Sequence, residues 1–162
     1  MALALLALGS NMGRPRDFLQ FALNELAQLG QITAQSDVYL TAAWGLEDQA
    51  DFENMALALQ CKLKPEELLK ACLNIEAKAG RIRKQKWGPR CLDIDIIFYN
   101  QEQIDLPQLQ IPHPQLHKRR FVLAPLAQIA PQFIHPNLKQ SIQDLLDRCQ
   151  DPLPVQKIAS QN

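Results

Sequence analysis

The fold is decided at residues 92–99, which read LDIDIIFY. Branched and aromatic side chains fill this stretch, and such side chains favour a β-strand. Asp93 and Asp95 stand two residues apart, and side chains at that spacing point to the same face of a strand. The sequence therefore predicts an apolar strand that carries two carboxylates side by side on one face.

Apolar patterns on either side of this strand predict the other elements of one α+β domain. A continuous apolar run at 2–8 is typical of a central strand that is covered on both faces. Helical spacing follows at 15–29, and Pro65 with two acidic residues begins a second helix, which ends near Ala79. Further strands are expected at 32–40 and 52–59, an extended segment at 109–114, and mostly helical structure at 121–149. This order predicts a ferredoxin-like α/β sandwich, with helices on one face of a mainly antiparallel sheet.

Composition limits the classes of function that fit the chain. It has 162 residues, of which 47% are apolar and 21% charged, with zero formal net charge. We therefore expect a single domain over 1–162, with no nucleic-acid partner and no membrane partner. The apolar start lacks a preceding basic residue and a cleavage site, which favours a first strand over a signal peptide. The proline-bearing tail from Asp151 is expected to pack loosely.

The four cysteines form no CxxC pair. This spacing argues against a disulfide framework or a thiolate zinc site, and it favours free thiols in a reducing compartment. We therefore expect a cytoplasmic protein, and we expect it to act as a monomer.

A basic segment at 81–90 leads directly into the dicarboxylate strand. Between Glu76 and Asp93 the chain has six Lys or Arg residues and no acidic residue. Carboxylates can hold magnesium against phosphate oxygens, while Arg and Lys neutralise the remaining negative charge. A second basic cluster follows, in which His113 is a candidate hydrogen-bond donor to phosphate. The pattern favours a magnesium-bound polyphosphate, and a solvated strand face beside a solvated basic loop is the alternative.

Two other classes of protein share parts of this pattern. A DxD glycosyltransferase would use a nucleotide sugar, but the chain is short for that class and shows no Rossmann half. A ferredoxin-like module without catalysis would bind a nucleotide or RNA through the basic segment. That second alternative leaves Asp93 and Asp95 unexplained beside the phosphates that they would repel. The sequence also lacks a GxxxxGK[ST] phosphate loop.

Four segments together resemble the 6-hydroxymethyl-7,8-dihydropterin pyrophosphokinase family of folate biosynthesis. They are GSNMG at 9–13, TAAWGLEDQADFEN at 41–54, KWGPRCLDIDIIFYN at 86–100 and IPHPQLHKRRFVLAPLAQIAP at 111–131. The four occur in the order and at the spacing of the family, across roughly residues 2–135. The resemblance implies a pyrophosphokinase, an enzyme that passes pyrophosphate from ATP to the hydroxymethyl group of a reduced pterin and releases AMP.

The resemblance also implies which residues serve ATP and metal. Asp93 and Asp95 would bind two magnesium ions that bridge the phosphates and the substrate hydroxyl. Arg81 and Arg83 would act on a catalytic loop that closes over ATP. The remaining ATP-binding residues would be Glu76, Lys86, Trp87, Arg90, His113 and Arg119.

A third set of residues would hold the pterin. Phe52 and Phe121 would stack on the two faces of the flat ring, an arrangement that suits aromatic side chains. Asn54 would read the amide edge of the ring, because a carboxamide offers both a donor and an acceptor. The pocket would be completed by Thr41, Ala42 and Trp44.

Overall fold

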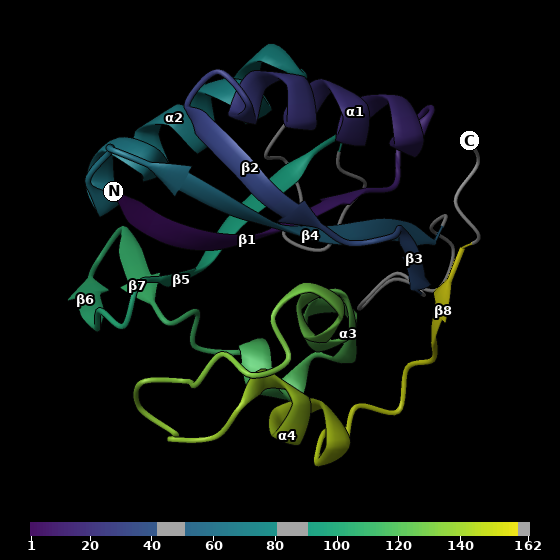
Figure 1. Ribbon diagram of the computed structural model, residues 1–162. Helices are drawn as coiled ribbons and strands as arrows, with labels where there is room; N and C mark the ends of the chain where they lie inside the picture. Colours follow the sequence, from purple (N-terminus) through teal and green to yellow (C-terminus); the bar gives the residue numbers. More distant parts are fainter. Residues whose placement is uncertain (42–50, 81–90, 159–162) are drawn as a thin grey trace.

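The computed structural model describes residues 1–41, 51–80 and 91–158. Figure 1 shows their arrangement as a sheet between two layers of helices. The strands are β1 (Ala2–Ser10), β2 (Gly30–Gln35), β3 (Tyr39–Thr41), β4 (Phe52–Cys61), β5 (Asp93–Tyr99), β6 (Ile104–Leu106), β7 (Leu109–Ile111) and β8 (Val155–Lys157). The helices are α1 (Pro15–Leu26), α2 (Pro65–Lys78), α3 (Arg120–Ile129) and α4 (Ile142–Asp147), with a 3-10 turn at Leu116–Lys118.

The apolar first strand lies at the centre of a six-stranded sheet. β1 pairs antiparallel with β4 on one side and with β5 on the other. The strand order is β5-β1-β4-β3-β8, and β2 also pairs with β4. The expected α+β class and antiparallel sheet are confirmed, and the run at 2–8 is a central strand.

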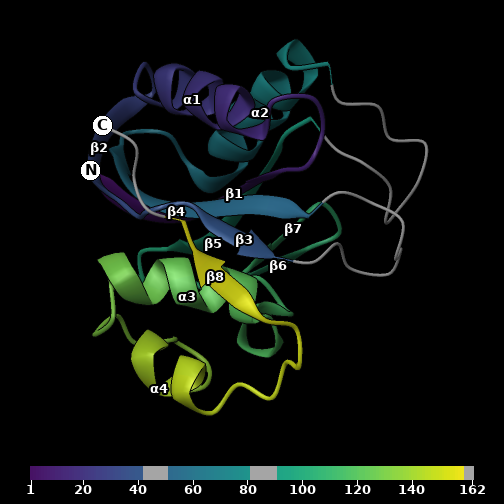
Figure 2. The same cartoon turned by 90° about the vertical axis from the view of Figure 1, so that its right-hand side faces the viewer.

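Helices cover both faces of the sheet, so the expectation of helices on one face was wrong. α1 and α2 lie on one side of the strands and α3 and α4 on the other, as Figure 2 shows. Leu6 and Leu8 pack into the core beneath α1 and α2, whereas Leu5 packs into the core beneath α3. A strand that is apolar on both faces must be covered on both faces.

Two other expectations differ from the structure. The strand expected at 32–40 is divided into β2 and β3, because the Ser36 hydroxyl accepts a hydrogen bond from the Ala56 N–H at 2.9 Å. The described part of the tail, residues 151–158, is not loose, because Asp151 is buried and β8 pairs with β3. Within the described ranges, no helix is long and apolar enough to cross a membrane.

Candidate active site

A row of residues across the three central strands brings the polar site residues together. Gly9 on β1 lies opposite Asn54 on β4 and opposite Asp93 on β5. Asp95 pairs with Ala7, one step along the same face. Because neighbouring strands lie about 4.8 Å apart, Asn54 and Asp93 are separated by about 10 Å across Gly9. A carboxamide and a carboxylate pair therefore share one face, with a glycine between them.

Further along the strands, helix α3 covers the face of the sheet that carries Asn54 and Asp93. Ala56 stands two residues from Asn54 and belongs to the core beneath α3. Phe52 stands two residues away in the other direction, so it shares the face of Asn54. Phe121, in the first turn of α3, packs at the border of the same core. Phe52 and Phe121 are both half-buried and lie on the same side of the sheet.

Thr41 fixes the orientation of the Asn54 carboxamide. Both side chains are buried, and Asn54 Nδ2 donates a hydrogen bond to Thr41 Oγ1 at 3.1 Å. The carbonyl oxygen of the same amide, Asn54 Oδ1, lies against Gly9. A Cβ added to Gly9 would stand only 2.7 Å from this oxygen. The missing side chain of Gly9 therefore makes room for the Asn54 carbonyl oxygen.

Glu76 holds the edge of the dicarboxylate strand. β5 ends the sheet on its side, so its outward N–H groups have no strand partner among the described residues. Glu76 Oε2 accepts a hydrogen bond from the Ile94 N–H at 2.7 Å, and the carboxylate is 3% exposed. This contact ties α2 to the backbone between Asp93 and Asp95, which stabilises their position.

The carboxylates of Glu76 and Asp95 act on the buried Cys72 thiol of α2. Burial, and then the neighbouring carboxylates Glu76 and Asp95, raise the pKa of the Cys72 thiol to about 12. The described residues hold no group of three or more His, Cys, Asp or Glu side chains that would bind a metal by themselves. Asp93 and Asp95 instead fit a magnesium ion whose other ligands are oxygens of a substrate or water.

A basic and aromatic cluster lies at the start of α3. The Arg119 guanidinium lies 5.8 Å from the centroid of the Phe121 ring. Burial and then the Arg119 charge lower the pKa of His113 to about 4, so its imidazole is neutral at pH 7. His113 Nδ1 accepts the Gln115 N–H at 3.3 Å, which leaves the ring proton on Nε2. His113 can therefore donate one hydrogen bond through Nε2.

Seven of the expected site residues fall outside the described residues. They are Ala42, Trp44, Arg81, Arg83, Lys86, Trp87 and Arg90.

Gly9 is the one residue in the row of Asn54, Gly9 and Asp93 that the sequence analysis did not identify as part of the site. A glycine at the end of an apolar strand was the available signal, because such a glycine often marks a close approach of another group.

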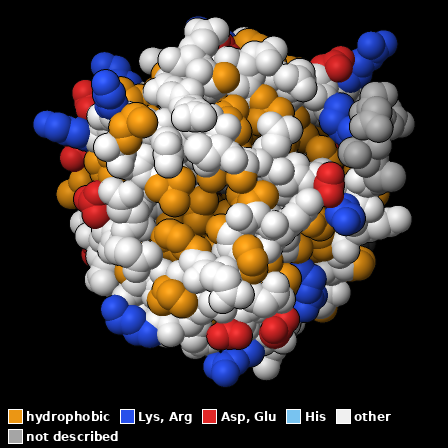
Figure 3. Space-filling model, viewed as in Figure 1, with side chains coloured by type: hydrophobic (Ala, Val, Ile, Leu, Met, Phe, Trp, Pro, Cys, Tyr) orange, Lys and Arg blue, Asp and Glu red, His pale blue; other side chains and the backbone are white. Residues whose placement is uncertain are grey.

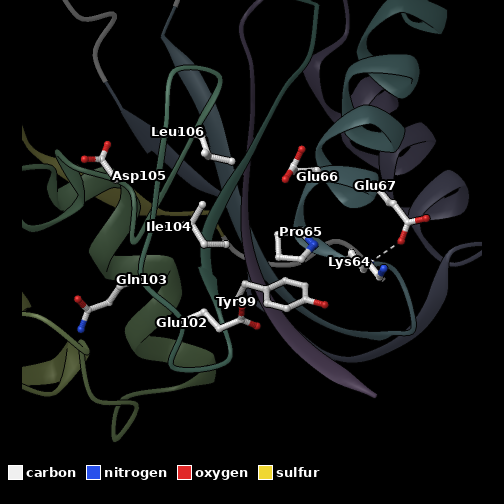
Figure 4. Close-up of a pocket in the computed structure, with 10 residues that line it drawn as sticks. All are labelled: Lys64, Pro65, Glu66, Glu67, Tyr99, Glu102, Gln103, Ile104, Asp105 and Leu106. Atoms are coloured by element: carbon white, nitrogen blue, oxygen red, sulfur yellow. Dashed lines mark hydrogen bonds between the residues drawn. The ribbon is translucent and has the colours of Figure 1, made fainter.

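A pocket of about 900 Å³ lies at the opposite end of β5. Figure 4 shows it between the beginning of α2 and the β6–β7 hairpin, with Tyr99 at its base. Tyr99 is the last residue of β5 and Asp93 is the first. The pocket therefore lies away from the row that holds the candidate site residues.

Comparisons with known proteins agree with this geometry. The model of the family described as 7,8-dihydro-6-hydroxymethylpterin-pyrophosphokinase (HPPK) matches residues 5–131. A 2-amino-4-hydroxy-6-hydroxymethyldihydropteridine pyrophosphokinase of Synechocystis is 44% identical over 147 residues, which cover 90% of this chain and 75% of that relative. The protein of the same name from Bacillus subtilis is 45% identical over 132 residues, which cover 80% of this chain and 79% of the relative.

A solved structure shares the fold. The Plasmodium falciparum HPPK-DHPS wild type with pteroate superposes with a TM-score of 0.74 at 17% identity. The match covers 91% of this chain and 42% of the other, so this chain spans less than half the length of that protein. At this identity the likeness concerns the fold alone.

Proposed function

The chain belongs to the 7,8-dihydro-6-hydroxymethylpterin-pyrophosphokinase family, and on that premise we propose how its residues divide the work of the reaction. The reaction transfers pyrophosphate from ATP to the hydroxymethyl group of 6-hydroxymethyl-7,8-dihydropterin in folate biosynthesis. Its products are the pterin diphosphate and AMP. ATP is the co-substrate, and the reduced pterin is the acceptor.

The pterin ring binds on the face of the sheet that carries Asn54. Phe52 and Phe121 stack on the ring from two sides, which is supported by their half-buried positions on that face. Asn54 offers its Oδ1 and its second Nδ2 hydrogen to the amide edge of the ring, because Thr41 accepts only one of the two Nδ2 hydrogens. Ala42 and Trp44 complete this pocket.

The ATP phosphates bind beside β5. Asp93 and Asp95 hold two magnesium ions, which would polarise the phosphate oxygens and lower the pKa of the substrate hydroxyl. Glu76 keeps the strand in place through the Ile94 N–H. Asp93 thus lies about 10 Å from the amide that orients the acceptor, across the row through Gly9, and Asp95 lies one step further along β5.

Basic side chains bind the charge that the phosphates carry. His113 donates through Nε2, and Arg119 approaches from the start of α3. Arg81 and Arg83 close over ATP and exclude water, which would otherwise compete as the acceptor. Lys86, Trp87 and Arg90 support the nucleotide. No covalent enzyme intermediate is needed, because positioning and charge stabilisation suffice for phosphoryl transfer.

The same proposal includes a cytoplasmic monomer. Asn54, Asp93 and Asp95 share one face of the sheet, and Glu76 reaches β5 from α2, so a single chain can supply these residues. Cys61 and Cys72 are free and buried, which suits a reducing compartment.

An RNA-binding module explains the structure less well. Such a module needs a basic surface, and in the view of Figure 3 acidic side chains are interspersed with the Lys and Arg of the described residues.

The observation that carries the proposed function is the row of Asn54, Gly9 and Asp93. In that row a carboxamide and a carboxylate share one face, which supports the proposed roles of Asn54 toward the pterin and of Asp93 toward the metal.

Metal counting tests this assignment. We expect the protein to bind two Mn²⁺ ions per chain in the presence of a non-hydrolysable ATP analogue, as measured by titration calorimetry or electron paramagnetic resonance. Asp93→Asn is expected to lose at least one of the two ions, because a neutral amide binds hard cations weakly. Asp105→Asn changes an exposed aspartate on β6 and serves as the matched control. Unchanged stoichiometry in Asp93→Asn would contradict the assignment.

A further inference from the structure

The segment 149–158, here called the C-terminal strap, joins the two layers that border the proposed pterin site. In Figures 1 and 2 it runs from the level of α4 past α3 to the edge of the sheet, where β8 lies beside β3. The strap lies beyond residues 5–131, which the family model matches. Its two ends are anchored in different ways.

The first anchor is Arg120 at the start of α3. Its guanidinium donates to the backbone carbonyls of Asp151 and Cys149, the latter at 2.8 Å. Its backbone N–H donates to Asp151 Oδ2 at 3.1 Å. Asp151 is 7% exposed, and its other oxygen accepts the Leu153 N–H at 3.0 Å. This is a charge-assisted, partly buried connection, and hydrogen bonds to charged groups are stronger than those between neutral groups.

The second anchor is the pairing of β8 with β3. Val155 lies opposite Thr41 and Lys157 lies opposite Tyr39. The Ile158 N–H extends the ladder with a hydrogen bond of 2.8 Å to the Val38 carbonyl oxygen. The strap therefore ends on the strand whose Thr41 orients Asn54.

A separate contact holds the other end of α3. Gln128, near the end of the helix, accepts the Tyr39 hydroxyl at 2.8 Å and the Asp37 N–H at 3.0 Å. The beginning of α3 has no such contact to β3 among the described hydrogen bonds, and there the strap makes the connection. Without the strap, the hydrogen bonds of Gln128 would still attach the end of α3 to β3. The first turn of α3, which includes Phe121, would lose the contacts that Arg120 makes with the strap.

We propose that Arg120 is a positioning residue for pterin binding, which acts through the strap to hold Phe121 at a set distance from Thr41 and Asn54. The inference rests on the proposed function, because it takes these three side chains as walls of the pterin pocket. The Arg120 guanidinium donates to backbone carbonyl groups, and in this proposal it contacts neither the pterin nor ATP. Of the ATP contacts proposed above, Asp93 and Asp95 lie on β5, which the strap does not reach, whereas Arg119 directly precedes Arg120 at the start of α3.

Ligand binding to Arg120→Ala and Asp151→Asn tests the proposal. Arg120→Ala removes the guanidinium of the anchor, and Asp151→Asn removes the carboxylate charge that accepts the Arg120 and Leu153 N–H groups. For each variant we expect the dissociation constant for 6-hydroxymethylpterin, in the presence of a non-hydrolysable ATP analogue, to rise, roughly tenfold for Arg120→Ala and less for Asp151→Asn. The dissociation constant for the analogue alone should rise clearly less than that for the pterin, since Arg119 is the one proposed ATP contact beside the anchor. Arg120→Lys should recover part of the loss, because one ammonium can reach one carbonyl but lacks the fork of a guanidinium.

Controls separate this role from general stability. Arg148→Ala removes an exposed arginine at the end of α4, whose contact is the Gln140 side chain at 3.2 Å, and should leave both affinities unchanged. Asp151→Asn keeps the side-chain volume, so it remains informative if Arg120→Ala does not fold. A lower melting temperature with unchanged pterin affinity in both variants, or an equal loss for both ligands, would overturn the proposal. If the wild type bound no pterin at all, the proposed function would fail first and the positioning role with it.

Discussion

Replacing Asp95 by alanine is expected to reduce AMP formation by at least about a thousandfold, measured at saturating ATP, magnesium and pterin. A metal ion contributes several kcal/mol of charge stabilisation in the transition state, and each 1.36 kcal/mol is about a factor of ten in rate. Asp95 and Asp93 project from one face of β5, so the loss of one carboxylate removes a ligand that the other cannot replace.

The fold should survive this substitution, because Asp95 is exposed and its neighbours Ile94 and Ile96 remain buried. Far-ultraviolet circular dichroism and the melting temperature are therefore expected to be close to those of the wild type. Asp105→Ala, at an exposed position on β6, is the matched control and should keep its rate. An Asp95→Ala protein that forms AMP within tenfold of the wild-type rate would refute the metal-binding role.

Adding one methyl group at Gly9 is expected to weaken pterin binding by about a hundredfold, while the affinity for an ATP analogue is retained. The new Cβ would lie 2.7 Å from Asn54 Oδ1, which is shorter than a van der Waals contact. Asn54 must then rotate, and it loses both its bond to Thr41 and the orientation of its carbonyl. Quenching of pterin fluorescence on titration with protein measures the change.

A double-mutant cycle isolates the cause. If Gly9 acts through Asn54, then Gly9→Ala should add almost nothing in an Asn54→Ala background, because the group with which the methyl clashes is already gone. Fully additive losses from the two substitutions would show that Gly9 affects pterin binding by another route.

The sequence predicted the elements whose pattern is local. The apolar run of β1, the proline and acidic start of α2, and the spacing of Asp93 and Asp95 on β5 each report on their own few residues, and each is found as expected. The break between β2 and β3 was not predictable in this way. It depends on a hydrogen bond from Ala56 to Ser36, which lie 20 residues apart in the chain.

The difference between local patterns and contacts of distant segments also explains which features of the site the sequence did not predict. The role of Gly9 depends on the register that sets it opposite Asn54 and Asp93, and no single segment carries that register. The tail looked loose because it is polar and proline-bearing, yet Asp151 is buried by a contact to Arg120, 31 residues away. The resemblance of four segments to one family supplied residue roles that local patterns alone did not.

The most direct test of the account is an analysis of the nucleotide and pterin products after the protein is mixed with ATP, magnesium and 6-hydroxymethyl-7,8-dihydropterin. The account predicts that AMP appears in equal amount to the pterin diphosphate, since attack on the β-phosphorus transfers two phosphoryl units together. Formation of ADP with a pterin monophosphate, or the absence of any pterin product, would contradict it.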